Sequence, residues 1–299
     1  MVKLPVVRGA LGALLLCVAA AHPAHSTESD PWTEPPSPYE RIIPAPASTA
    51  PGGPGYTLGP RTVIRTTAGS AEVRAIGEQL AARWRRAARL PLPVRATDAG
   101  AGTDGIRLRL DPYGGGFGEE GYRLQSDEDG VLVTAHRPAG LFRGTQTLRQ
   151  LLSGGAAPWT VAGGTVTDTP RFAHRAAAVD IVARPFTAAR LKRYVDRLAL
   201  YKINVLRLRL ADGLWTEAEY RDLVRYAGGR YIAVLADRHA APAPAPPHAW
   251  GTWALPRIVA IAELGWSPAG SQDSVSSSPS RLSMNELTEN TARPGPAGP

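Results

Sequence analysis

The first half of the chain carries apolar residues at two different periods. Between residues 71 and 90 they recur every three or four positions, with the charges on the other side, which predicts an amphipathic helix. A second apolar stripe, over residues 139–152, is followed by Gly154-Gly155 and predicts another helix. Three stretches between these helices alternate with the period of a strand, namely 106–110, 122–125 and 131–135. We therefore expect a small N-terminal α+β sandwich domain over residues 56–168.

The second half of the chain alternates strand and helix patterns. The expected strands are 176–182, 205–210 and 231–235, and the expected helices between them are 187–200 and 217–226. Thr187 is the expected N-cap of the first of these helices. Strands that alternate with helices are typical of parallel βαβ units. Residues 169–268 therefore predict an α/β fold.

Three segments have compositions that do not favour a packed core. Residues 27–55 are rich in Pro, Ser and Gly, and we expect a disordered linker there. Consecutive prolines in a seam at residues 240–249 remove backbone donors and break the alternation of strands and helices. Residues 269–299 are again rich in Ser, Pro and Gly, and we expect a disordered tail.

The first 26 residues have the pattern of a secretory signal peptide. Lys3 and Arg8 precede the apolar run 11–20, and small residues follow it. This run is too short to span a bilayer comfortably, so we expect a secreted, extracellular protein with no membrane association after signal removal. Cys17 would suit a lipoprotein anchor, but the bulky Leu16 stands where that processing site takes a small residue.

The composition of the chain limits which cofactors and partners we expect. Cys17, the one cysteine among the 299 residues, lies inside the predicted signal, which leaves the mature chain without disulfides or thiol chemistry. The net charge of +8 involves 34 basic residues, of which three are lysines and 34 − 3 = 31 are scattered arginines. No basic stripe is interleaved with aromatics, so we expect no nucleic-acid partner. No cluster of His, Cys and carboxylates has ligand spacing, so we expect no metal and no other cofactor.

Several blocks, in the same order along the chain, resemble glycoside hydrolase family 20, the β-N-acetylhexosaminidases. Gly121-Tyr-Arg-Leu124, Asp129-Gly-Val131 and the stripe at 139–152 resemble the non-catalytic N-terminal domain of that family. Residues 171–239 resemble the beginning of its catalytic barrel, and residues 253–268 resemble the last barrel helix. A complete eight-fold β/α barrel needs roughly 250 residues. The resemblance therefore implies an incomplete (β/α) TIM-type barrel interrupted at the seam.

The resemblance also implies a mechanism whose acids are missing here. In the family, the 2-acetamido oxygen of the sugar attacks the anomeric carbon, while an Asp orients that group and an adjacent Glu is the general acid. The family presents this pair in a His-x-Gly-Gly-Asp-Glu run, which this sequence lacks. Its adjacent acidic residues, Glu119-Glu120 and Asp127-Glu128-Asp129, fall in predicted turns, where we expect solvated charges. We therefore assign no catalytic residue.

Three residues match substrate-binding positions of the family. The resemblance implies that Arg175 hydrogen-bonds sugar hydroxyls, which suits a planar guanidinium, and an ordinary surface arginine is the alternative. Asp212 matches an aspartate at the end of the second barrel strand; otherwise it caps the helix that begins near Thr216. His239 matches a histidine that couples this aspartate to the catalytic acid, and the alternative is a lone surface histidine.

Taken with the family resemblance, these features predict a secreted β-N-acetylhexosaminidase-family protein that is internally truncated and catalytically impaired. Its expected partners are glycans that contain N-acetylhexosamine. A gene model that omits the middle of an intact gene would give the same string of residues. The alternative is a non-catalytic secreted module for carbohydrate or protein interaction, in which the N-terminal domain folds alone and the barrel part is loosely attached.

Overall fold

The computed structural model describes the chain between residues 37 and 268, with gaps. The described residues are 37–97, 104–113, 115–153, 157–181, 186–211, 213, 215–239, 258, 262–263 and 265–268. The predicted signal peptide, the seam and the tail lie outside them and stay predictions.

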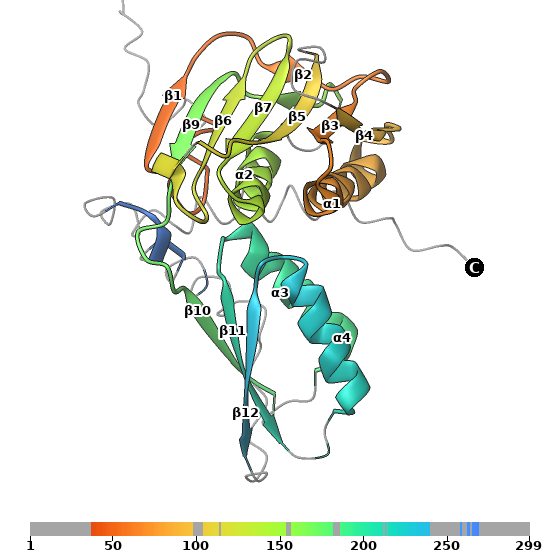
Figure 1. The fold of residues 1–299 in the computed structure, drawn as a ribbon, viewed down its shortest axis with the longest axis vertical. Helices are drawn as coiled ribbons and strands as arrows, with labels where there is room; N and C mark the ends of the chain where they lie inside the picture. Colours follow the sequence, from red (N-terminus) through yellow and green to blue (C-terminus); the bar gives the residue numbers. More distant parts are fainter. Residues whose placement is uncertain are drawn as a thin grey trace, which may run out of the picture. The chain divides into compact units, whose positions relative to one another are not determined.

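A seven-stranded mixed sheet forms the framework of the first half (Figure 1). Its strands are, in spatial order, β1 (Ser48–Pro51), β9 (Gly164–Asp168), β6 (Tyr122–Ser126), β7 (Gly130–Ala135), β5 (Gly105–Leu110), β3 (Ile64–Thr67) and β4 (Val94–Thr97). The pairs of β3 with β4 and β5, and of β5 with β7, are parallel, whereas the pairs made by β6 and β1 are antiparallel. A short antiparallel pair, β2 (Tyr56–Thr57) and β8 (Thr160–Val161), and the 3-10 helix η1 (Gly115–Phe117) complete this half.

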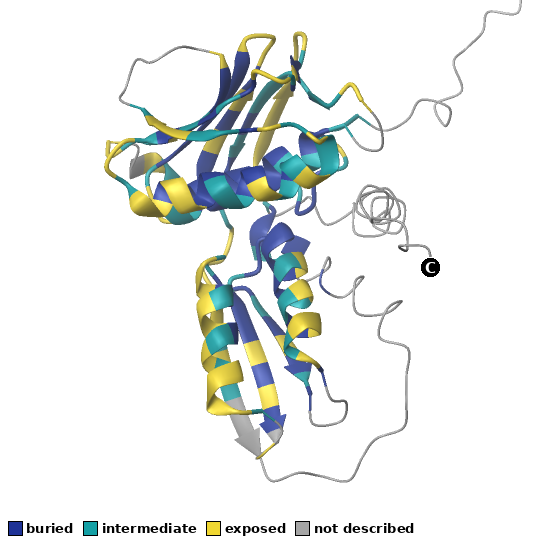
Figure 2. Ribbon diagram, turned by 90° about the vertical axis from the view of Figure 1, so that its right-hand side faces the viewer, coloured by how far each residue is buried: buried dark blue, intermediate teal, exposed yellow. Residues whose placement is uncertain are grey.

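Two helices pack on this sheet, as their apolar periods predicted (Figures 1 and 2). The first, α1 (Ala71–Ala88), begins at Ser70, whose hydroxyl accepts a hydrogen bond from the Val73 N–H at 3.2 Å. The second, α2 (Pro138–Leu151), opens with a proline in its first turn. A side chain at Gly140 or Gly144 of α2 would collide with the strands beneath. These glycines therefore let α2 lie close to β6 and β7.

The prediction that residues 27–55 form a disordered linker is wrong for the part that the structure describes. Within it, β1 pairs with β9 along its whole length. Ile42 and Ile43 are fully buried, and the Tyr39 hydroxyl donates to the carbonyl of Ala162, which lies 123 positions later. Order therefore begins well before Tyr56, because partners distant in the sequence supply the contacts that the local composition lacks.

The second half forms a separate three-stranded parallel sheet in the order β10-β11-β12 (Figure 1). Its elements are β10 (Ala176–Asp180), α3 (Ala188–Leu200), β11 (Val205–Ala211), α4 (Glu217–Gly228) and β12 (Ala233–His239). Thr187 is the N-cap of α3, and Thr216 forms a capping box with Glu219 at the start of α4. The predicted parallel βαβ units are confirmed.

One face of this three-stranded sheet is buried and the other is open. Along β11, Leu206, Leu208 and Leu210 are buried, whereas Arg207 and Arg209 are exposed, an alternation visible in Figure 2. The described strands therefore form an open sheet, and the structure does not confirm the predicted incomplete barrel.

Two further boundaries differ from the sequence prediction or extend it. β12 begins at Ala233 and not at residue 231, because Tyr231 has a left-handed backbone (φ 56°) that ends the preceding turn. Of the predicted last helix, the structure describes a few helical positions, among which Ile258, Ala262 and Trp266 are buried.

Candidate functional site

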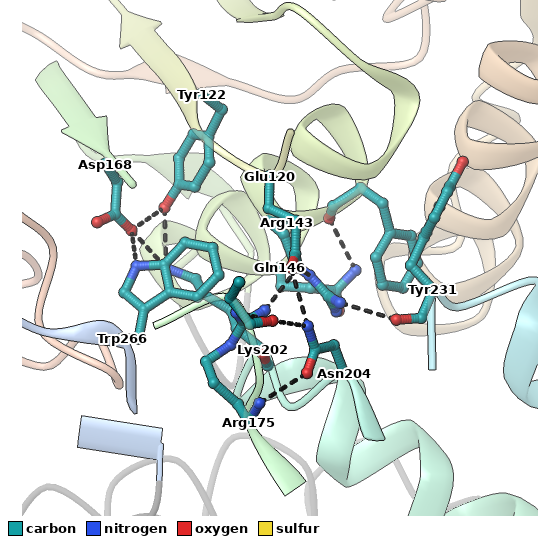
Figure 3. Close-up of polar contacts among 12 residues, drawn as sticks. Glu120, Tyr122, Arg143, Gln146, Asp168, Arg175, Lys202, Asn204, Tyr231 and Trp266 are labelled. Carbon is teal, nitrogen blue, oxygen red and sulfur yellow. Dashed lines mark hydrogen bonds and ion pairs between the residues drawn. The ribbon is translucent and has the colours of Figure 1, made fainter. Parts of the chain in front are cut away.

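A carboxylate joins the seven-stranded domain to the three-stranded sheet (Figure 3). Glu120 lies in the turn before β6, and its Oε2 accepts hydrogen bonds from Arg143 Nε at 2.7 Å and from Arg175 Nη2 at 2.6 Å. Its Oε1 accepts from Asn204 Nδ2 at 3.0 Å. Arg143 belongs to α2, whereas Arg175 and Asn204 lie just before β10 and β11. One acidic side chain thus connects three elements.

The charge state of Glu120 follows from these partners. Both guanidinium groups are fully buried, and the Glu120 side chain is 14% exposed. Burial would raise the pKa of Glu120, but the charges of Arg143 and Arg175, and the hydrogen bonds that they donate, lower it below its ordinary value. Glu120 is therefore ionised near neutral pH and holds no proton to donate to a leaving group.

A second buried cluster is centred on Asp168, at the end of β9. Its Oδ2 accepts hydrogen bonds from Lys202 Nζ, the Tyr122 hydroxyl and Trp266 Nε1, each at 2.7 Å. Its Oδ1 accepts from the Ala47 N–H at 2.9 Å. Lys202 Nζ also donates to the Tyr122 oxygen at 2.9 Å. Both members of the Lys202–Asp168 pair have no exposed side-chain surface, so this pair depends entirely on its protein partners.

Burial also sets the pKa values in this cluster. Burial lowers the pKa of the Lys202 ammonium, and the nearby Asp168 carboxylate opposes that change in part. Burial and the charge of Asp168 raise the pKa of the Tyr122 hydroxyl well above its ordinary value, so the phenol stays protonated. The phenol can therefore donate to Asp168 while it accepts from Lys202.

We call the two clusters together the joint. It consists of Glu120 with Arg143, Arg175 and Asn204, and of Asp168 with Tyr122, Lys202 and Trp266. A general acid or base must come within hydrogen-bond distance of the substrate atom that it protonates or deprotonates. Asp168, Lys202 and Tyr122 are sealed from solvent, and Glu120 is engaged by two cations. These groups can hold the two halves of the chain together, but in this arrangement none of them can reach a glycan.

The structure places Arg175 inside this joint. Its side chain donates to Glu120, to the carbonyl of Lys202 at 2.9 Å and to the carbonyl of Phe172 at 2.7 Å, and the residue is 2% exposed. It is therefore not an ordinary surface arginine. These contacts lie within the protein, and the predicted sugar contact stays a prediction that they do not support.

The other two predicted site residues belong to the opposite end of the three-stranded sheet. His239 ends β12, and its backbone position is opposite Ala211, the last residue of β11. Asp212 is outside the described residues. Because Arg175 precedes β10 and the strands are parallel, the structure does not bring Arg175 and His239 together. Asp212 is also not the cap of α4, since Thr216 has that role.

The acidic neighbours in the N-terminal domain separate into two kinds. Asp127, Glu128 and Asp129 are exposed, as expected for a turn, and Asp127 accepts hydrogen bonds from two turn amides. Glu119 is exposed as well. For Glu120 the prediction of a solvated charge is wrong, because Arg143 and Arg175 approach it from 23 and 55 positions away.

Sequence reasoning did not identify Lys202 or Asp168, although one signal was present. The chain uses arginine at 31 of its 34 basic positions, so a lysine is unusual. The compact ammonium of Lys202 donates to both Asp168 and Tyr122. This signal marks Lys192 and Lys202 alike, although Lys192 reaches the surface and pairs with Asp222.

The described residues offer neither a metal site nor a membrane-crossing helix. Within them, no group of three or more His, Cys, Asp or Glu residues is placed to hold a metal ion. None of the described helices combines the length and the apolar character that a membrane crossing requires.

Comparison with known proteins gives these features a family context. The profile of "Glycosyl hydrolase family 20, domain 2" matches residues 39–169. A β-N-acetylhexosaminidase of Cellulomonas fimi is 37% identical over 164 residues, which are 54% of this chain and 32% of that protein. The family 20 β-N-acetylhexosaminidase of Streptomyces coelicolor A3(2) has a solved structure that is 41% identical, with a TM-score of 0.61 over 68% of this chain and 47% of that one.

A further solved structure, a mutant Streptomyces plicatus β-hexosaminidase in complex with its product GlcNAc, is 41% identical with a TM-score of 0.59. It is covered to 46% of its length, and this chain to 68%. The chain thus spans less than half the length of these relatives. The matched profile, the order of the blocks and the shared fold agree, and residues 39–169 belong to glycoside hydrolase family 20 as its domain 2.

Proposed function

We propose that this chain is a secreted protein of β-N-acetylhexosaminidase descent whose hydrolytic activity is impaired. In this proposal the seven-stranded domain is the non-catalytic domain of the family, and β10 to β12 with α3 and α4 are the opening units of an incomplete barrel. The parallel order of the three strands and the likeness to the Streptomyces coelicolor structure support this assignment.

The observation that carries the proposal is the absence of an Asp-Glu pair in a barrel-like segment of the sequence. Neighbouring acidic residues occur only at positions 119–120 and 127–129, both in the seven-stranded domain. Among them, Glu120 is held by two buried arginines with a lowered pKa, which is the opposite of what a general acid needs. Loss of a general acid alone typically costs a factor of about 10²–10⁴ in rate.

The proposed partners are glycans with terminal N-acetylhexosamine. The relatives are named as β-N-acetylhexosaminidases, and one of them was solved with GlcNAc as its product. Retained binding would use the carboxyl end of the three-stranded sheet, where His239 lies and Asp212 follows β11. We propose no nucleic-acid partner, and secretion without membrane attachment follows from the signal pattern of residues 1–26.

Release of p-nitrophenol from p-nitrophenyl N-acetyl-β-glucosaminide by the purified protein tests this proposal. We expect no turnover above that of the Asp212→Asn variant, which lacks the carboxylate that matches a substrate-binding position of the family. Arg175→Ala is unsuitable as a control, because it would break the joint. Wild-type turnover that the Asp212→Asn change abolishes would refute the loss of hydrolysis.

Binding and secretion need separate measurements. Titration of the protein with GlcNAc, followed by calorimetry, distinguishes a sugar-binding remnant from a module without sugar affinity. Export is tested by expression of the full chain and N-terminal sequencing of the protein in the medium. A mature N-terminus near residue 27 is expected, and retention of residues 1–26 on protein inside the cell would contradict secretion.

A non-catalytic interaction module is the second candidate, because the matched family profile is that of domain 2 and covers the seven-stranded domain. Limited proteolysis distinguishes the two assignments. A protected core that ends between residues 154 and 170 favours the independent module, whereas protection that continues to Trp266 favours one joined unit.

A further inference from the structure

The end of the described chain crosses the joint between the two sheets. We name residues 262, 263 and 265–268 the clasp. Trp266 of the clasp is fully buried, and its Nε1 donates to Asp168. Its ring lies 4.5 Å from Lys202 Nζ and 4.8 Å from the Arg175 guanidinium carbon, measured to the ring centroid (Figure 3). One indole therefore contacts cations of both buried clusters.

The clasp also holds the backbone that connects the sheets. The segment between β9 and β10 contains Arg171 and Phe172, whose N–H groups donate to the carbonyls of Trp266 and Gly265, both at 3.0 Å. The side chains of these two residues are exposed. The protection of their amides thus comes from the clasp and not from burial of their side chains.

A third set of contacts ties the clasp to the N-terminal segment before β1. Glu263 Oε2 accepts a hydrogen bond from the Ala45 N–H at 3.0 Å, and the Ser267 hydroxyl lies 2.8 Å from the Ala45 carbonyl oxygen. Glu263 is 5% exposed and adds a negative charge near Lys202. The clasp therefore touches residues on both sides of the joint.

We propose that the clasp holds the two sheets together, and that its release opens the connection at residues 171–172 before either sheet unfolds. None of the described ladder pairings includes the clasp. Its release therefore breaks side-chain contacts and a few backbone hydrogen bonds, but no strand pairing. Proteins open locally in contiguous cooperative units, so a segment held without strand pairing can be released while the sheets stay folded.

Hydrogen exchange of the full chain, resolved to the Arg171 and Phe172 amides, tests whether release of the clasp opens this connection. In Trp266→Ala we expect these amides to exchange at least about tenfold faster than in the wild type, while amides of β5 and β7 change by less than about twofold. Trp215→Phe is the matched control, because Trp215 is a partly buried tryptophan between β11 and α4. It should leave the two amides unchanged.

Each other outcome has a definite meaning. Unchanged exchange at Arg171 and Phe172 in Trp266→Ala would overturn the proposal, and so would equal acceleration of all amides, since the joint would then open only with global unfolding. If Trp266→Ala does not fold, Ser267→Ala replaces it as the test. We then expect about threefold faster exchange at the same amides, and unchanged exchange would count against the role of the clasp. A wild-type dimer that becomes monomeric in these variants would show that the clasp binds a second copy of the chain, and would refute its role within one chain.

Discussion

Replacing Glu120 by glutamine removes one charge from the joint while it preserves the shape of the side chain. Arg143 Nε and Arg175 Nη2 lie 2.7 and 2.6 Å from the same carboxylate oxygen, and both guanidinium groups are fully buried. Removing one member of a buried ion pair typically costs 3–5 kcal/mol, because the remaining charge has no compensation. The glutamine carbonyl still accepts one hydrogen bond, so we expect Glu120→Gln to cost about 3 kcal/mol of the free energy of unfolding.

The neighbouring residue provides a matched control. Glu119 is 79% exposed and lies 3.5 Å from an Arg137 side chain that is itself 54% exposed. Exposed pairs of this kind are screened by solvent and contribute little, so Glu119→Gln should cost less than about 0.5 kcal/mol. Urea denaturation of both variants, followed by circular dichroism, measures the two free energies. A cost of about 3 kcal/mol corresponds to a fall in Tm of about 6–12 °C for a domain of 150–250 residues.

Comparison of the two glutamine variants shows whether the ion pairs of Glu120 stabilise the fold. If Glu120→Gln unfolds at the same urea concentration and with the same m-value as Glu119→Gln, the ion pairs of Glu120 do not stabilise the fold and do not act as a joint. If its m-value falls while the midpoint is kept, the variant has lost cooperativity between the sheets.

Three further measurements test the charge of Glu120, the Lys202–Asp168 pair and the cap of α3. Because the folded-state pKa of Glu120 lies below its ordinary value of 4.5, its stabilising effect is complete above that pH and is lost as the pH falls through the folded-state pKa; the stability difference between wild type and Glu120→Gln, measured by urea titration, should therefore shrink on acidification, and a constant difference would contradict this. Lys202→Met leaves Asp168 as an uncompensated buried charge and should cost about 3 kcal/mol; adding Asp168→Asn should restore part of that loss in a double-mutant cycle, and strict additivity of the two changes would argue against the pair. Thr187→Ala removes the N-cap of α3 and should lower the free energy of unfolding by about 1 kcal/mol, with Thr187→Ser close to wild type; equal stability of both variants would count against the cap.

Features whose cause is local could be predicted from the sequence. The apolar stripes of α1 and α2 and the cap Thr187 act within a few residues, and the structure has the four helices near their predicted bounds. The strand β1 was missed, because its pairing partner β9 lies more than 100 residues later and its own composition is typical of a linker. Composition describes the cost of ordering a segment, but not the sheet edge that it joins.

The buried joint was hidden for a related reason. A Glu-Glu pair in a turn is normally solvated, and only tertiary contacts reveal that Glu120 and Glu119 have opposite environments. Arg175 was singled out through a resemblance, and its buried contacts in the joint could not be read from that match. Asp212 lies outside the described residues, and His239 is placed by its strand position alone.

The complete burial of Lys202 allows an amine-reactive reagent to detect opening of the joint. The sequence contains three lysines, and of the two in the described part, Lys192 reaches the surface while Lys202 is enclosed by Tyr122, Asp168 and Trp266. An amine-directed acylating reagent will therefore modify Lys192 in intact molecules and Lys202 only in those whose enclosure has come apart. The ratio of the two modified peptides in a mass spectrum would count such molecules without an engineered probe.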